Sequence, residues 1–100
     1  MNKAVKNIWS IDICEELSNI LAKTTNLTTM QDFLSDILTE KEITEISARL
    51  KAADMLSNGQ KYDKVIIETR LSSRTIARIS KWLKEGRGGY AKVLNERTHT

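Results

Sequence analysis

The sequence predicts an all-α fold, and three of its features support that prediction. The 100-residue chain contains no proline, so no proline ring interrupts a long helix. Aromatic residues are few, and no stretch alternates polar and apolar residues over the length of a strand. Apolar residues instead recur at spacings of three and four, which is the period of an α-helix. We therefore expect one small helical domain.

Capping signals place the boundaries of six expected helices. Thr28 or Thr29 can cap the second helix, and Thr39 with Glu42 forms a capping box before the third. Gly59 tolerates the left-handed conformation that ends a helix. The expected helices are residues 3–23, 28–38, 40–57, 62–69, 72–83 and 90–97, with a glycine-rich break at 85–89.

The apolar pattern also predicts which side chains are buried. The residues expected to face inward are Met30, Phe33, Leu34, Ile37 and Leu38 of the second helix, Ile43, Ile46, Leu50, Ala53 and Leu56 of the third, and Tyr90, Val93 and Leu94 of the last. On the first helix, apolar residues from Val5 to Leu21 cover a broad face, and Ile8 and Ile11 fall outside it. A domain this small cannot cover so wide a surface alone. We therefore expect residues 1–60 to be the dimerisation helices of an intertwined homodimer.

Residues 61–84 predict a helix-turn-helix. A short helix, Tyr62 to Thr69, leads through a tight turn to Ser72, whose hydroxyl can cap the next helix. The second helix carries one apolar stripe, Ile76, Ile79 and Leu83. The residues left free for a partner are Ser73, Arg74, Ala77, Arg78 and Lys81. Because Arg, Ser and Thr can hydrogen-bond base edges, this face suits the major groove of DNA.

Two residues depart from the usual form of this motif. Arg70 occupies the turn position where glycine is common, and Ile66 occupies a position where a small residue normally lets the helices cross closely. The alternative interpretation is an ordinary pair of helices with a solvated, basic face.

Charge is unevenly distributed along the chain. Residues 1–60 carry six Lys/Arg against nine Asp/Glu, whereas residues 61–100 carry ten against four. A basic half that contains the expected recognition helix is typical of a phosphate-contacting surface. Lys81, Lys84 and Arg87 lead away from the base-reading end, so we expect them to contact phosphates. The alternative is that the basic half only confers solubility.

Several other classes of protein are not indicated. The single Cys14 permits no internal disulfide, which fits a reducing cytosol. There is no long apolar run or signal-peptide core, so we expect a cytoplasmic protein without a membrane anchor. His99 has no second ligand at metal-binding spacing, and no catalytic motif occurs, so we expect no metal, no cofactor and no catalytic residue.

Arg49 is unusual because it lies on the apolar side of the third expected helix. Its guanidinium there needs an acidic partner, a carbonyl or an anionic ligand. Alternatively, its stem follows the edge of the core and its head reaches water. Spacing alone leaves both interpretations open.

Taken together, these motifs resemble a known family. The pattern L-T-x-x-E from Leu38, the arginine at 49, L-x-x-G at 56–59 and S-x-R-T-I-x-R at 72–78 is similar to the Trp repressor family. The glycine-rich segment before Tyr90 is similar to the YerC/YecD subgroup in particular. The resemblance implies a six-helix fold, an intertwined homodimer and sequence-specific binding of double-stranded DNA.

The resemblance also implies roles for individual residues. The positions that hold the tryptophan corepressor fall on Thr39, Arg49 and Arg78, and the base-reading positions fall on Lys64, Ser73, Arg74, Thr75 and Ala77. Trp82 stands where the family has a serine that contacts the corepressor. We expect its indole to be buried and to fill the ligand's space, so free L-tryptophan is not the expected corepressor, and any other corepressor is left open.

We therefore predict a homodimeric, non-enzymatic transcriptional regulator, most simply a repressor. Two alternatives come from other classes of protein. One is a small dimeric mutase-like enzyme, in which Arg49 and Arg78 clamp a dianion. The other is an interaction adaptor that keeps the fold without DNA binding, an interpretation that Arg70 in the turn keeps open.

Overall fold

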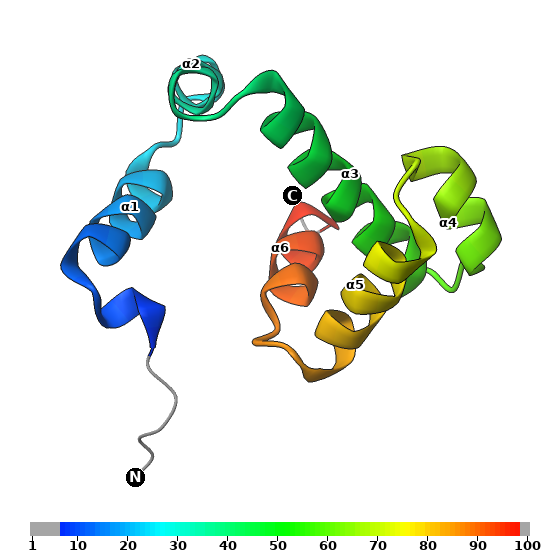
Figure 1. Cartoon of the computed structure of the whole chain (residues 1–100). Helices are drawn as coiled ribbons and strands as arrows, with labels where there is room; N and C mark the ends of the chain where they lie inside the picture. Colours follow the sequence, from blue (N-terminus) through cyan, green and yellow to red (C-terminus); the bar gives the residue numbers. More distant parts are fainter. Residues whose placement is uncertain (1–6, 99–100) are drawn as a thin grey trace, which may run out of the picture. The chain divides into compact units, whose positions relative to one another are not determined.

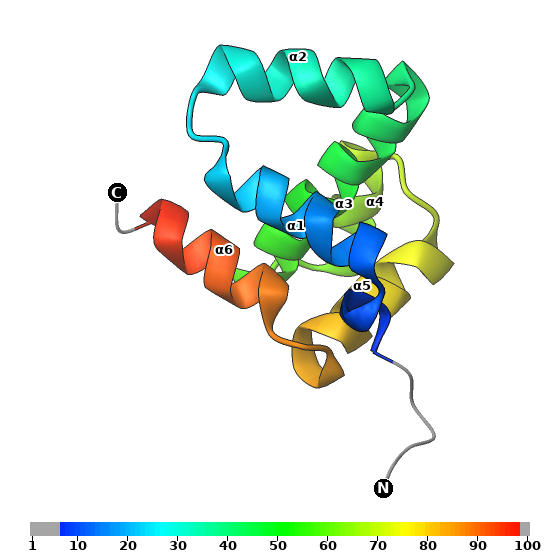
Figure 2. The same ribbon diagram turned by 90° about the vertical axis from the view of Figure 1, so that its left-hand side faces the viewer.

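The computed structural model describes residues 7–98, with side chains through residue 95. This part of the chain contains six α-helices and a short 3-10 turn, and it contains no strand. The elements are η1 (Ile8–Ser10), α1 (Asp12–Lys23), α2 (Leu27–Ile37), α3 (Glu40–Ser57), α4 (Tyr62–Thr69), α5 (Ser73–Glu85) and α6 (Gly89–Thr98) (Figures 1 and 2). The expected all-α, six-helix fold is confirmed.

The chain forms two compact units, divided between Thr39 and Glu40. The first contains η1, α1 and α2, and the second contains α3 to α6. The sequence pattern had grouped α3 with the two preceding helices. In the structure α3 belongs with the helix-turn-helix, because it packs against α4, α5 and α6.

The first expected helix is shorter than predicted. Residues 3–6 of that helix lie outside the described residues, and residues 7–11 do not continue it. The side chain of Asn7 accepts a hydrogen bond from the backbone N–H of Trp9 at 3.0 Å, and Ile11 is extended with φ −82° and ψ 125°. Such local side-chain bonds compete with the helical ladder, so α1 begins only at Asp12.

Helix α2 begins at Leu27, before both predicted caps, Thr28 and Thr29. Its N-cap is Asn26, whose side-chain oxygen accepts a hydrogen bond from the backbone N–H of Thr29 at 2.9 Å. Every side chain described in residues 7–39 is half-buried or exposed. Ile37, expected to face inward, is 48% exposed, and Leu27 is 71% exposed. This unit therefore presents a large apolar surface.

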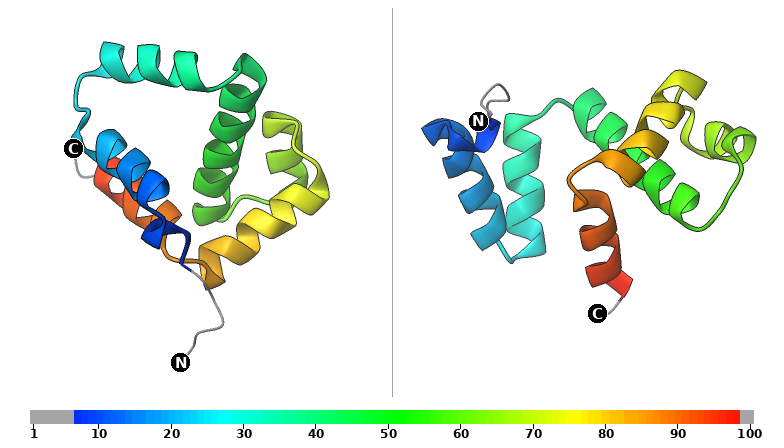
Figure 3. Two further views of the ribbon diagram at one scale, coloured as in Figure 1. Left: turned by 60° about the vertical axis from the view of Figure 1, so that its left-hand side comes forward. Right: turned by 90° about the horizontal axis from the view of Figure 1, so that it is seen from below.

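The core of the second unit gathers around the C-terminal half of α3. In Figures 1 and 3, α4 and α5 lie against that half. The buried residues are Ala52, Ala53 and Met55 of α3, Val65 of α4, Ile76 and Ile79 of α5, and Leu94 of α6. The small alanines let the neighbouring helices approach α3 closely. The buried face of α3 therefore differs from the predicted stripe, which consists mostly of larger Ile and Leu side chains.

Of the predicted α3 stripe, only Ala53 is buried. Ile43 and Leu56 are half-buried, while Ile46 is 54% exposed and Leu50 is 40% exposed. The prediction was wrong because packing of α4 and α5 concentrates the core near the C-terminal end of α3. On α6, Leu94 is buried as expected, but Val93 is 56% exposed.

Helix α3 ends as its sequence predicts. Gly59 has φ +81°, a left-handed conformation that glycine adopts without strain. The backbone N–H of Gln60 donates to the carbonyl of Met55 at 3.1 Å, and that of Gly59 donates to the carbonyl of Leu56 at 3.0 Å. These two bonds form a Schellman motif, which ends α3 and directs the chain into α4.

Arg70 ends α4 in the same left-handed conformation, with φ 62° and ψ 16°. Its backbone N–H donates to the carbonyl of Ile66 at 2.8 Å. Thr69 supports the turn, because its hydroxyl oxygen accepts from the backbone N–H of Leu71 at 3.3 Å. A residue with a Cβ is strained in this region, so the turn stores strain at Arg70.

Replacing Arg70 with glycine should relieve this strain. We expect Arg70→Gly to raise the free energy of unfolding by about 1 kcal/mol, since glycine removes the Cβ clash at a moderate cost in unfolded-chain entropy. Urea denaturation at one protein concentration measures the change. Arg70→Ala is the matched control, because it removes the same charge but keeps Cβ. An Arg70→Gly variant no more stable than Arg70→Ala would contradict this account.

Candidate nucleic-acid interface

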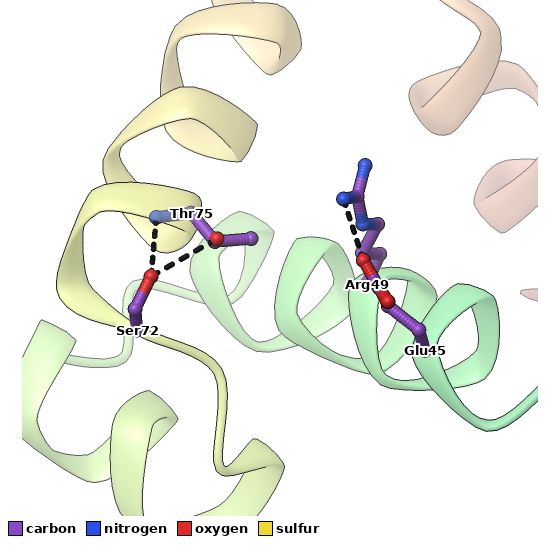
Figure 4. Close-up of polar contacts among 4 residues, drawn as sticks. All are labelled: Glu45, Arg49, Ser72 and Thr75. Atoms are coloured by element: carbon purple, nitrogen blue, oxygen red, sulfur yellow. Dashed lines mark hydrogen bonds and ion pairs between the residues drawn. The ribbon is translucent and has the colours of Figure 1, made fainter. Parts of the chain in front are cut away.

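The start of α5 is set by Ser72. Its side-chain oxygen accepts a hydrogen bond from the backbone N–H of Thr75 at 3.1 Å, and its hydroxyl donates to the Thr75 hydroxyl oxygen at 3.0 Å (Figure 4). Ser72 itself is extended, with φ −69° and ψ 157°. The predicted N-cap is confirmed, and it places Ser73 as the first helical residue.

The core determines which face of α5 points outward. Ile76 is 0% exposed and Ile79 is 3% exposed, and Leu83 packs half-buried against the same core. The predicted apolar stripe is confirmed. Because this face is held by α3 and α4, the opposite side of α5 must face solvent.

The structure brings most of the candidate DNA-contacting residues onto the exposed surface of one compact unit. The exposed ones are Lys64 on α4, Ser73, Arg74, Ala77, Arg78, Lys81 and Lys84 on α5, and Arg87 after it. Thr75 is half-buried and its hydroxyl is held by Ser72. Within residues 7–98, none of these cations is held in an ion pair. They are therefore available to phosphates and base edges.

Sequence reasoning missed one residue of this surface. Ile67 on α4 is 76% exposed, one of the most exposed large apolar side chains among the described residues. It follows Lys64 by three positions, so the two side chains are neighbours on one face of the helix. The run Val65–Ile66–Ile67 obscured it, because an eight-residue helix with three successive apolar residues does not indicate which of them faces outward.

A groove of about 600 Å³ lies between α3, α5 and α6. Its lining is mainly apolar, and much of it is Ile46 and Leu50 of α3, Trp82 of α5, and Tyr90 and Val93 of α6. Spacing had predicted the α3 residues as core. In the structure they form the wall of this groove instead.

Arg49 also lines the groove. Its contacts show whether its guanidinium has an acidic partner or only reaches water. Its Nη2 donates to Oε2 of Glu45, one turn earlier, at 2.8 Å (Figure 4). The two side chains are 41% and 49% exposed, whereas Nε of Arg49 is buried without a hydrogen-bond partner. The stem thus lies at the edge of the core, while the head reaches an acidic partner on its own helix.

In a single copy Trp82 does not fill the groove, contrary to the expectation of a buried indole. Its side chain is 52% exposed. Trp82 lies roughly 100° around α5 from Leu83, at the margin of the buried stripe, where it forms a wall. Gly86 lies directly beneath it, since a Cβ at Gly86 would meet the Trp82 carbonyl oxygen at 2.5 Å and Cε3 at 3.3 Å.

Of the three residues expected to hold a corepressor, one lines the groove of the second unit. Arg49 lines the groove, while Arg78 is exposed on α5 and is absent from the groove lining. Thr39 precedes α3 and also does not line the groove. Arg49 and Arg78 of the second unit therefore do not share the groove.

The described part of the chain offers neither a metal site nor a membrane span. Residues 7–98 contain no group of three or more His, Cys, Asp or Glu side chains suited to holding a metal ion. None of the helices described is both long enough and apolar enough to traverse a lipid bilayer.

The fold and the helix-turn-helix match those of known proteins. The sequence profile of the family described as "Trp repressor protein" matches residues 13–98. The chain belongs to the Trp repressor family.

Two relatives in this family can be compared over most of their length. The "Uncharacterized protein YerC" of Bacillus subtilis (strain 168) is 32% identical over 81 residues, which are 81% of this chain and 78% of that protein. The crystal structure of a TrpR like protein from Eubacterium eligens ATCC 27750 is 28% identical, with a TM-score of 0.87 over 93% of this chain and 96% of that one. The predicted similarity to YerC is confirmed.

In this Trp repressor family member, the contact between Gly86 and Trp82 can be tested directly. Gly86→Ala should lower the free energy of unfolding by roughly 1–3 kcal/mol, because Cβ would overlap the Trp82 carbonyl oxygen. Thermal unfolding followed by circular dichroism measures the loss. Gly89→Ala is the control, since nothing lies within 4 Å of a Cβ there. Equal stability of the two variants would show that the close approach is unimportant.

Proposed function

We propose that this protein is a sequence-specific, double-stranded-DNA-binding transcriptional regulator, acting as a repressor in the cytoplasm. The observation that carries the proposal is the outer face of α5. Its stripe of buried isoleucines directs Arg74, Arg78 and Lys81 outward, and none of these cations is ion-paired. A capped helix with this face suits the major groove. Membership in the Trp repressor family supports a DNA-binding regulator.

The two alternatives find less support. A dianion clamp needs Arg49 and Arg78 in one site, but only Arg49 lines the groove, and Glu45 already neutralises it. The adaptor alternative rested on Arg70 in the turn. The turn accepts Arg70 in the left-handed conformation, and α5 still begins with a formed Ser72 cap. Arg70 therefore gives no reason to exclude DNA binding.

The regulator that we propose is an intertwined homodimer. Residues 7–39 bury no side chain and expose Trp9, Ile13 and Leu27, among other large apolar residues. The groove of the second unit is likewise apolar and open, with Ile46 and Trp82 exposed. We infer that α1 and α2 of one subunit cover the groove of the other. Both apolar surfaces would then leave water.

Charge supports the same assembly. Residues 7–39 carry one Lys/Arg against five Asp/Glu, whereas residues 40–100 carry thirteen against eight. Opposite net charges favour the approach of the first unit of one copy to the second unit of another. The basic second units of the two copies would repel each other, and the acidic first units would offset that repulsion by lying against them.

The dimer predicts a strong effect of Trp9→Asp. We expect the wild type to sediment as a dimer at micromolar concentration, and Trp9→Asp to lose both the dimer and much of the helical circular dichroism. The reason is that the interface is also the core of the first unit. Asn19→Asp adds the same charge at an exposed position of α1 and is the control. A stable, folded wild-type monomer would remove the proposal of a dimer.

We further propose that the regulator does not need free L-tryptophan. The expected reason, a buried Trp82, does not hold in a single copy. The proposal now rests on two other observations: Arg78 does not line the groove, and the Trp82 indole forms its wall where the family has a small hydroxyl residue. Whether a different ligand acts is left open in the proposal.

DNA binding and its electrostatic part are tested by salt titration. Wild-type protein should bind duplex fragments enriched from genomic DNA, with equal affinity with and without L-tryptophan. Lys81→Ala should weaken all duplexes alike and lower the slope of log K against log salt by roughly one unit. Lys51→Ala, on the exposed side of α3, is the control and should leave the slope unchanged. Failure to bind duplex DNA would refute the function, and a tenfold gain with L-tryptophan would refute its independence of that ligand.

A further inference from the structure

We propose that Arg74 reads a guanine in the major groove, so that each half-site contains one guanine on which affinity depends. This inference rests on the DNA-binding function proposed above and adds the base that the helix recognises. It follows from the position of Arg74 on α5, from the absence of any competing partner, and from the geometry of the guanidinium group.

The position of Arg74 directs it toward base edges. At 100° per residue it lies almost opposite the centre of the buried stripe formed by Ile76, Ile79 and Leu83. It is also the second residue of α5. The N-terminal residues of a recognition helix are those that contact base edges in the major groove. Lys81 shares this outward direction but lies roughly two turns further along, and Arg87 lies beyond the end of the helix.

The guanidinium of Arg74 has no other partner to satisfy. Its side chain is exposed and makes no ion pair or hydrogen bond among the described residues. The one carboxylate of α5 is Glu85, eleven residues away and therefore roughly three turns along the helix. Of its neighbours on the outer face, Ser73 and Ala77 are small, and Arg78, one turn later, is a second exposed arginine without an ion pair.

Other residues near the start of α5 are less suited to read a base. The Thr75 hydroxyl is bonded to Ser72 and the residue is half-buried. Arg70 is the C-cap of α4 and lies outside α5. Among free groups at this end, only Arg74 presents the planar pair of donors that matches O6 and N7 of guanine. A lysine or a serine does not reproduce that paired geometry.

Selection from a randomised duplex library tests the inference with the full-length protein. Wild type should select a half-site with one nearly invariant guanine, and Arg74→Ala should lose preference at that position alone. The affinity of wild type for the selected site should fall roughly 5- to 100-fold when this base pair is changed. Arg74→Lys keeps the charge but loses the paired donors, so it should bind nonspecific DNA normally and still lose the preference.

A base analogue isolates the contact itself. Replacing the selected guanine with 7-deazaguanine removes N7 and should weaken wild type several-fold, while leaving Arg74→Ala unaffected. Arg78→Ala is the matched control, because it removes an exposed arginine one turn later and should retain the guanine preference. All variants should unfold at the wild-type temperature, since both side chains are exposed.

The outcomes separate this inference from the function on which it rests. If Arg74→Ala weakens every sequence equally and keeps the selected guanine, Arg74 contacts phosphate and the inference is overturned while DNA binding stands. If wild type selects no sequence at all, both the inference and the sequence-specific function are overturned. If Arg74→Ala loses the preference at one guanine and is insensitive to 7-deazaguanine, while wild type is weakened by it, both the inference and the DNA-binding function are supported.

Discussion

Burial of Ile76 against α3 and α4 is the interaction on which the rest of the second unit depends. Ile76 and Val65 are the largest fully buried side chains, and they share a cluster with Ala52 and Ala53. Alanines permit the three helices to approach closely without leaving a cavity. With Ile76 fixed inward, α5 cannot rotate, and the direction of every other side chain on it follows from the helical period.

The fixed rotation of α5 places its basic side chains on the exposed surface. Arg74 and Arg78 are exposed because the apolar stripe is buried on the opposite side of the helix. Their availability has a second cause, since the carboxylates of α4 and α5 do not engage them in ion pairs. Arg49 shows the contrast: it has a carboxylate one turn away and is held by it. Arg74 and Arg78, by contrast, have no carboxylate one turn away on α5.

The two units differ in how much of their own apolar surface they bury. The second unit has a buried core, whereas residues 7–39 expose large apolar side chains throughout. A groove lined by Ile46, Leu50 and Trp82 remains open on the second unit. In the dimer proposed above, mutual covering of these surfaces between two copies would stabilise a chain of only 100 residues.

Local chemistry, readable from the sequence alone, determined the bounds of α3 and α4, the Ser72 cap, the Gly59 helix end and the outward cations of α5. Caps and helical periodicity depend on residues within one or two turns, so spacing reveals them. Only the tertiary structure decided which face of α3 is buried, how exposed Trp82 is and which of three apolar residues on α4 points outward. Each of these depends on where a neighbouring helix packs. One helix can offer two apolar faces, and its own sequence does not say which of them a neighbour will cover.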